Sequence, residues 1–418
     1  MLSCNHIRNF VCAAALVLSG TLCAQVKPGI EVLREQNFKC LEGKRVGLVT
    51  NPSGVDSQLR STVDILYSAP NVNLVALYAP EHGIRGDIYA GGKVESGVDE
   101  TTGLPVHSLY GSTRQPTPEM LKGIDIMVYD IQDVGSRSYT FISTLGLVMR
   151  SCAEADIPVV VLDRPNPLGG LKVEGPLVRD GFFSFVGQYE IPYIYGLTVG
   201  ELATFVNEKG LNRGQNGKLE PLKCALTVIP MKGWRREMLF EDTGLPWVLP
   251  SPNIPYPESA IGYPSAGLCG ELYNYLNIGI GYTLPFGTFA EEWIDADKLK
   301  ARLDSYNVPG VAWRTIHYKP TSGRLNGKMV HGVQYYYTDF EKAYVTLTQF
   351  YVMQAVFELY GKNPFKGSAD SFAMFNKVCG TDYVYKTFGQ SMKVSSISSF
   401  WCGDAEKFKA ESAKYHIY

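Results

Sequence analysis

The sequence lacks an excess of charge of either sign and, beyond its first residues, lacks any long hydrophobic run. Its 418 residues carry a formal net charge of −2, so no field attracts nucleic acid or an anionic membrane. No later segment approaches the length of a membrane-spanning helix. With 45% hydrophobic and 19% charged residues the composition is globular, and the length favours two domains.

Three motifs of common enzyme classes are also missing. TNPSGVD stands where a dinucleotide-binding fold carries GxGxxG, so we expect no NAD or FAD. HExxH is absent and the chain has only 6 His, so His82 with the nearby aspartates is a weak metal set. GxSxG is absent, which argues against a serine hydrolase. We expect neither a cofactor nor a metal.

The N-terminal segment, residues 1–24, has the pattern of a secretory signal. Arg8 precedes a short apolar run, Phe10–Leu18, and small residues lead to a cleavage site after Ala24. We therefore expect a periplasmic or secreted protein. The alternative, a lipoprotein acylated at Cys23, is disfavoured because bulky Leu22 occupies a position that prefers a small residue.

The cysteines are too few and too scattered to build the fold. Six of the 9 lie after residue 24, and none forms a CxxC motif, so neither zinc binding nor a dense disulfide framework is indicated. Export permits disulfides, and Cys379–Cys402 is the first pair to test. Buried free thiols are an equally good interpretation.

The first half of the chain alternates apolar strands with amphipathic helices, which predicts a Rossmann-like α/β domain with a mostly parallel sheet. Continuous Val/Ile/Leu runs suit strands buried on both faces. The strand-containing segments are Arg45–Gly54, Val72–Gly86, Asp125–Ser138 and Pro158–Gly170. The helices are expected over Asp56–Ser68, Arg137–Ala155 and Leu197–Lys209, the last with a capping box from Thr198 to Glu201.

The second half predicts a smaller, mixed α+β domain. Pro246–Pro264 is rich in proline and is expected to be irregular, as a domain junction or a rigid cleft wall. We therefore place a Rossmann-like domain at residues 25–254 and a C-terminal domain that closes the cleft at 255–418. Beyond the junction we expect helices over Asp295–Tyr306 and Tyr344–Tyr360, and strands over Trp313–Tyr318 and Gly332–Tyr337.

Polar residues follow each of the four apolar strands of the first half. They are Asn51, Glu81, His82, Asp130, Asp133, Asp163, Arg164 and Asn166. Ligands of parallel sheets bind outside the carboxyl ends of the strands, so four such ends together predict a site. Glu81, beside His82 and Arg85, suits general acid or base work. The structural alternative is that Glu81 caps a turn or pairs with Arg85.

The other strand ends favour substrate binding. Arg137 is placed to neutralise Asp130 or Asp133, although structural pairing explains these acids equally well. In DRPNP, two prolines stiffen the loop that presents Asp163, Arg164 and Asn166 to a substrate. The alternative there is a buried Asp–Arg scaffold pair. The aromatic segment Tyr189–Tyr195 and Trp247 could form a sugar platform, with buried packing as the alternative.

Long motifs then make the sequence recognisable. LVTNPSGV, LYAPEHGIRG, YDIQDVGSRSYT, VVLDRPNPLGG, YGLTVGELA and PSPNIP together resemble the exo-β-N-acetylmuramidase (NamZ-type) family of peptidoglycan hexosaminidases, formerly a domain of unknown function. The resemblance spans the mature chain. It implies an exported glycosidase that releases N-acetylmuramic acid from non-reducing ends of peptidoglycan fragments. It makes Glu81 the leading catalytic carboxylate. Tyr195, in the aromatic segment, and Asn253, in PSPNIP, are further substrate-binding candidates.

A second family motif is only partly kept. Glu271 and Asn274 match it, as a second acid and a substrate-binding residue, but Ile280 stands where the family has Arg. His331 stands where Cys is common. The loss of a guanidinium predicts a different way of holding an anionic lactyl or peptide substituent, because Ile cannot form a bidentate contact.

Several mechanisms remain open at this point. Glu81 and Glu271 could serve as the two carboxyl groups of a retaining or inverting glycosidase. The 2-acetamido group could instead be the nucleophile, oriented by Asp130 or Asp133. A lyase could use Glu81 and His82 to eliminate the lactyl ether. A non-catalytic muropeptide-binding protein and a metal-dependent amidase or esterase are the alternatives from other classes.

Overall fold

The computed structural model describes residues 25–86, 91–213, 219–367 and 369–418. The expected signal segment, residues 1–24, lies outside the described residues. Within them, no helix is both long enough and apolar enough to cross a membrane.

A seven-stranded sheet forms the centre of the first domain, in the order β3-β4-β2-β1-β5-β6-β9. All neighbouring pairs are parallel except β3 with β4. The predicted α/β class with a mostly parallel sheet is therefore confirmed. The strands are β1 Arg45–Thr50, β2 Asn73–Ala79, β3 Gly97–Val98, β4 Pro105–Ser108, β5 Ile126–Asp130, β6 Val159–Leu162 and β9 Leu226–Ile229.

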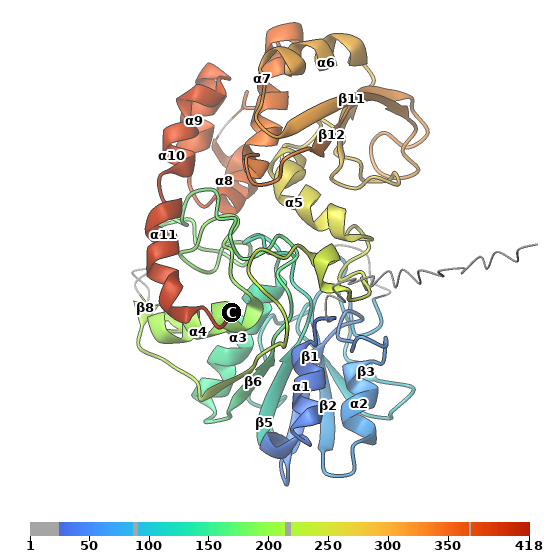
Figure 1. The fold of residues 1–418 in the computed structure, drawn as a ribbon, viewed down its shortest axis with the longest axis vertical. Coiled ribbons are helices and arrows are strands. Elements are labelled where there is room, and N and C mark those ends of the chain that lie inside the picture. The colour runs from blue at the N-terminus through green and yellow to red at the C-terminus, as the bar shows by residue number, and fades with distance from the viewer. Residues whose placement is uncertain (1–24, 87–90, 214–218, 368) are drawn as a thin grey trace, which may run out of the picture.

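Helices cover both faces of this sheet, because successive strand side chains are apolar on both sides. Leu48 and Val128 pack with α1 (Gly29–Glu35) and α2 (Thr62–Ser68) on one face. Val49 and Tyr129 pack with α3 (Phe141–Glu154) and α4 (Val199–Lys209) on the other. The predicted capping box of α4 is present. Figure 1 shows the parallel strands running toward the second domain.

The second domain stands at the carboxyl ends of the strands (Figure 1). It contains a three-stranded antiparallel sheet in the order β10-β12-β11, the helices near it and a run of C-terminal helices along one side of the molecule (Figure 1). Its strands are β10 Thr288–Glu291, β11 Val311–Tyr318 and β12 Val330–Tyr337. Its helices are α5 Pro257–Gly270, α6 Ala296–Ser305, α7 Thr348–Tyr360, α8 Ala373–Cys379, α9 Tyr383–Ser391, α10 Ser398–Cys402 and α11 Ala405–Ser412.

Short elements complete the described chain. A two-stranded ribbon joins β7 Asn212–Arg213 to β8 Leu219–Glu220. Turns of 3₁₀ helix lie at Lys39–Leu41, Phe240–Thr243, Val345–Leu347, Ala369–Phe372, Val394–Ser396 and Ala413–Tyr415.

Helix α5 corrects the prediction for the proline-rich junction. We expected Pro246–Pro264 to be irregular, yet α5 begins at Pro257 and contains Pro264. Proline is tolerated in the first helical turn because that N–H has no intrahelical partner. Farther along, Pro264 gives up one backbone hydrogen bond, while its carbonyl accepts a bond from Gln349 Nε2 at 3.0 Å. Tertiary contacts thus extend the helix past a residue that ordinarily ends one.

The C-terminal tail returns to the first domain, which the sequence did not predict. The ring of Tyr415 lies 5.3 Å from Phe205 of α4, edge to face. The hydroxyl of Tyr418 donates to Asp163 Oδ2 at 2.8 Å. One continuous hydrophobic core also includes residues of both domains. The two domains are therefore held together at their core and by the tail.

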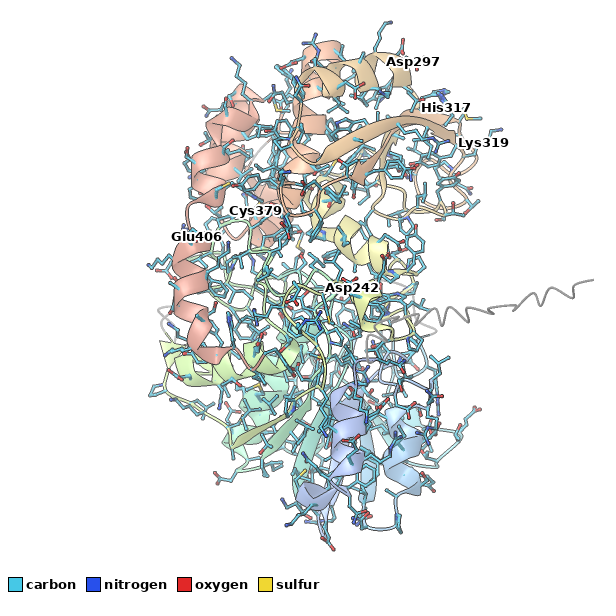
Figure 2. All side chains as sticks on the ribbon, viewed as in Figure 1. Asp242, Asp297, His317, Lys319, Cys379 and Glu406 are labelled. Atoms are coloured by element: carbon cyan, nitrogen blue, oxygen red, sulfur yellow. The ribbon has the colours of Figure 1, made fainter. Side chains whose placement is uncertain are left out.

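Arg137 joins the domains, and its position corrects a prediction. Its two Nη atoms donate to four carbonyls, those of Pro176, Ile191, Val378 and Cys379, at 2.6 to 3.0 Å. The side chain is fully buried, and burial lowers the pKa of Arg137 to about 10. It neutralises neither Asp130 nor Asp133 and has no route to a substrate. Figure 2 labels Cys379 where α8 meets the loops of the first domain.

The six described cysteines are all free thiols, including Cys379 and Cys402. The Cys379–Cys402 pairing is therefore not formed, and the alternative of free thiols describes the structure. Four of them, Cys152, Cys224, Cys269 and Cys379, are buried.

We predict that Arg137→Met lowers the free energy of unfolding by about 3–5 kcal/mol, because four buried carbonyls lose their charged donor. Chemical denaturation monitored by circular dichroism measures this. Arg45→Met is the control, because Arg45 forms an exposed pair with Asp125 and such pairs contribute little. Equal effects of the two substitutions would contradict the interdomain role.

Candidate active site

A tight turn directly after β2 presents Glu81. The amide of Gly83 donates to the carbonyl of Pro80 at 3.1 Å and closes the turn. His82 adopts a φ of 74°, a left-handed conformation that is uncommon for a residue with a side chain and is often found at functional sites. The buried imidazole of His82 contacts Phe141 edge to face, with ring centroids 6.4 Å apart. The turn therefore fixes the direction in which Glu81 projects.

Two neutral donors hold the Glu81 carboxyl group. The hydroxyl of Thr140 donates to Oε2 at 2.8 Å, and the backbone amide of Gly91 donates to Oε1 at 3.0 Å. Thr140 precedes α3 but does not cap it with its side chain, so its hydroxyl is available for Glu81. Glu81 is half-buried and has no ion pair among the described residues.

Two tyrosines, Tyr110 and Tyr139, lie near this carboxyl group, and a third packs against Tyr139. They were not singled out from the sequence. Burial and the charge of Glu81 raise the pKa of Tyr110 to about 12. Burial raises the pKa of Tyr139 well above its ordinary value, and the charges of Asp133 and Glu81 add to this. The ring of Tyr139 meets Tyr263 of α5 edge to face at 5.5 Å. Tyr139 and Thr140 belong to the SRSYT segment, whose hydroxyl groups were the available signal.

Glu271 approaches the same aromatic pair from the second domain. It is the residue that follows α5, and it is exposed to solvent. The surrounding protein nevertheless raises its pKa by desolvation, and its charge raises the pKa of Tyr263 further. The charge of Glu81 raises the pKa of Tyr139, and the charge of Glu271 raises the pKa of Tyr263. The two acids therefore flank the pair of tyrosine rings. No hydrogen bond links their carboxyl groups.

Asp130 and Arg164 form a buried ion pair rather than a pair of substrate ligands. Arg164 Nε lies 2.5 Å from Asp130 Oδ1, and Nη2 lies 2.9 Å from Oδ2. Thr62 also donates to Asp130. The scaffold alternative is therefore correct, but the partner of Arg164 is Asp130 and not Asp163.

The polar groups of Asn51, at the end of the neighbouring strand, also have hydrogen-bond partners within the protein. Asn51 Oδ1 accepts hydrogen bonds from the amide and hydroxyl of Ser53, and Asn51 Nδ2 donates to the carbonyl of Pro250. The space beside Gln132 and Arg164, under the segment Pro246–Val248, is only about 10 Å³. A sugar does not fit there, so these strand ends form a covered platform.

Asp163 and Asn166 also have structural partners. Asp163 accepts hydrogen bonds from the hydroxyl of Thr198 at 2.7 Å and the amide of Gly200 at 2.8 Å, both at the start of α4. Asn166 donates to the carbonyl of Leu197 and accepts from the amide of Leu168. Both are buried, which corrects the expectation that they hydrogen-bond to a substrate.

Asp133 differs from the other buried acids. Its Oδ2 accepts hydrogen bonds from the amide of Gly135 and the hydroxyl of Tyr195, but its buried Oδ1 has no partner. Burial raises the pKa of Asp133 to about 6. Tyr195 is itself fully buried, so it supports Asp133 and does not offer a face to a sugar.

The remaining candidates lie apart from this group. Arg85 pairs with Asp99 at 2.5 Å. Asn253 is half-buried in the segment that covers Asn51. Asn274 lines a separate hollow of about 290 Å³ beside Trp293. The departures from the family motif also lie elsewhere.

Ile280 packs against the core, and His331 Nδ1 lies 2.7 Å from His317 Nδ1 across β11 and β12. Among the described residues no group of three or more His, Cys, Asp or Glu is arranged to hold a metal. A further cleft, of about 780 Å³, opens between the domains. Asp242 and Glu406, labelled in Figure 2, lie on its rim. None of the predicted site residues lines it.

Comparisons with known proteins cover nearly all of the chain. Sequence models described as exo-β-N-acetylmuramidase NamZ, N-terminal and C-terminal, match residues 46–258 and 261–418. A *Bacillus subtilis* (strain 168) protein named peptidoglycan β-N-acetylmuramidase NamZ is 42% identical over 394 residues, which is 94% of this chain and 92% of that protein.

Two solved structures are also similar, both of DUF1343 family proteins from *Bacteroides fragilis* NCTC 9343. The first is 51% identical with a TM-score of 0.87, and the second is 29% identical with a TM-score of 0.73. Each match covers 94% of this chain and 99% of the other. The fold is therefore that of these proteins over nearly their full length.

The raised pKa of Asp133 predicts a pH-dependent stability. The folded state keeps this proton up to about pH 6, whereas the unfolded state loses it near pH 4. Wild-type stability therefore falls as pH rises between these values, by at most about 3 kcal/mol. Asn does not titrate, so Asp133→Asn should gain stability relative to wild type by up to that amount between pH 4 and pH 7.

Denaturant unfolding at each pH measures this difference. Asp125→Asn is the control, because the contact with Arg45 lowers the pKa of Asp125 to about 2. Its stability difference from wild type should stay constant between pH 5 and pH 7. A difference for Asp133→Asn that is equally constant would show that Asp133 does not titrate as described.

Proposed function

The chain belongs to the exo-β-N-acetylmuramidase NamZ family, and from this premise we propose that it is a glycoside hydrolase acting on peptidoglycan. It releases N-acetylmuramic acid from the non-reducing end of peptidoglycan fragments. The family match includes both domains, and the relative from *B. subtilis* is similar over 92% of its length. The observation that carries the assignment is the position of Glu81, fixed by Thr140 beside the domain junction.

We assign Glu81 the role of acid/base. Hydrolysis breaks the bond between the anomeric carbon and the glycosidic oxygen. The leaving oxygen takes a proton, and water supplies a hydroxyl to the anomeric carbon. A group that gives and then takes a proton must be stable in both forms. Among the described residues no Lys or Arg forms an ion pair with Glu81, and its Oε2 contacts the hydroxyl of Thr140, a group that can either donate or accept.

Glu271 is the second carboxyl group in this proposal. Its raised pKa favours the protonated form, and it reaches the site from the opposite domain. Asp133 and His82 are placed around Glu81 as supporting groups. Asp133 is buried, as Asp163 and Asn166 are, so it supports the site without contacting the sugar. Asn51 and Asn253 contribute through the segment that walls the site, and not by direct contact.

We also propose that the protein acts outside the cytoplasm, in the periplasm or as a secreted enzyme. The support is the signal pattern of residues 1–24 and the location of peptidoglycan beyond the inner membrane. The N-terminal residue of the protein recovered from cells tests this proposal. Gln25 is expected, whereas an uncleaved N-terminus would contradict it.

We predict that Glu81→Gln lowers kcat for a chromogenic β-glycoside of N-acetylmuramic acid by about 10³-fold, because Gln keeps the size and polarity of Glu but cannot transfer a proton. Glu154→Gln is the matched control, since Glu154 is a carboxylate on α3 paired with Arg150. It should keep wild-type turnover. Near-normal turnover by Glu81→Gln would remove Glu81 from the mechanism.

Thr140 provides a graded version of the same test. Thr140→Val is nearly isosteric and removes only the hydroxyl, so we expect kcat to fall about tenfold with a small change in KM. Thr140→Ser keeps the hydroxyl and should restore most of the rate. If valine and serine have the same effect, the hydrogen bond to Glu81 does not position it for catalysis.

A further inference from the structure

We propose that the guanidinium of Arg114 binds the free lactyl carboxylate of the muramic acid residue. The inference rests on the proposed function and names a specificity residue for it. Arg114 was not among the residues predicted from sequence.

The arginines predicted to bind substrate are already committed to other groups. Arg164 pairs with Asp130, Arg85 pairs with Asp99, and Arg137 donates to four carbonyls. The position where the family motif has Arg is occupied by Ile280. Arg164 and Arg137 are buried, and Arg85 already directs Nε and Nη2 to Asp99.

Arg114 is held in place by aromatic rings and has no anionic partner. Its guanidinium carbon lies 4.2 Å from the ring centre of Phe185 and 4.9 Å from that of Tyr110. The two rings are 6.2 Å apart and tilted, so the cation packs against both at their junction. No carboxylate of the described residues forms an ion pair with Arg114, and the side chain is exposed. A guanidinium carries five N–H donors, so Arg114 keeps donors for an anion besides its hydrogen bond with Tyr110.

Tyr110 connects this cation to the catalytic carboxyl group. The charge of Glu81 raises the pKa of Tyr110 after burial, and Arg114 opposes that rise. Both groups therefore lie close to the same phenol. In the proposal, a sugar whose anomeric carbon lies at Glu81 has its lactyl substituent within reach of Arg114. The side chain of Tyr110 lies between the two residues.

The ligand chemistry follows from charge and shape. Arg114 lines a hollow of about 380 Å³ together with Phe183 and Phe185. A stacked guanidinium beside aromatic walls suits a planar carboxylate, which accepts two parallel N–H bonds. The lactyl carboxylate is the one ionised group of bare N-acetylmuramic acid. In a muropeptide that carboxyl group is an amide, so it loses its charge and one of its acceptor oxygens.

The test compares two chromogenic glycosides, one of N-acetylmuramic acid and one in which the lactyl carboxyl group is a primary amide. For Arg114→Gln, kcat/KM for the acid should fall about 10- to 100-fold, mainly through KM. For the amide it should change less than about threefold. Arg114→Lys should be intermediate, because it keeps the charge and loses the planar fork. Equal losses for both glycosides, or no loss for either, would overturn the proposal.

Arg150→Gln is the matched control. Arg150 lines the same hollow but pairs with Glu154, so its removal should leave the acid-to-amide ratio unchanged. A ratio that falls equally in both variants would show a general effect of positive charge, and would also overturn the proposal.

Calorimetric binding separates this proposal from the proposed function. Wild type should bind free N-acetylmuramic acid at least tenfold more tightly than N-acetylglucosamine, and Arg114→Gln should remove the preference. If wild type cleaves neither glycoside but shows this preference, the hydrolase assignment fails and the role of Arg114 stands. Equal binding of the two sugars by wild type would overturn the role of Arg114 alone.

Discussion

The hydrogen bond from Thr140 to Glu81 is the contact on which the candidate site depends. It links the turn after β2 to the start of α3, two segments separated by about 60 residues of chain. Both elements pack in the buried core of the first domain. The carboxyl group is therefore held in a fixed position. The donor is neutral, so the group is held in position without being locked in one charge state. A catalytic acid/base requires both properties.

At the strand ends of this sheet, some charged side chains stabilise the fold and others are available for chemistry. Asp130 and Arg164 neutralise one another under the proline-rich segment, and Asp163 anchors both α4 and Tyr418. An unpaired charge at these depths would cost several kcal/mol, so complete satisfaction is the condition for burying them. Glu81 and Arg114 lie outside that covered platform, and neither has an ion pair among the described residues.

Local patterns in the sequence were sufficient to predict the class of fold. The apolar runs, the helical spacing between them and the capping box of α4 are short-range signals, and each of these elements is present. The family resemblance, carried by long motifs, is likewise confirmed. The position of polar residues after the parallel strands predicted which side chains lie close together. It did not distinguish substrate-binding residues from structural ones, because that depends on hydrogen-bond partners from distant parts of the chain.

The features missed from sequence are all long-range. Arg137 sits near two acids in the sequence, but two of its four partners come from α8, more than two hundred residues away. Tyr263 lies in α5, within a segment that the prolines predicted to be irregular. Tyr110 and Arg114 occur in no recognisable motif, and their significance comes from the stacking with Phe185. Aromatic and cationic side chains of this kind gain a role only once tertiary contacts are known.

A crystal structure with N-acetylmuramic acid bound tests the central claim most directly. The account predicts the anomeric carbon within about 3.5 Å of a Glu81 carboxyl oxygen and the lactyl group toward Arg114. A sugar bound instead in the cleft beside Asp242 and Glu406, with Glu81 still held by Thr140 and empty of ligand, would contradict it.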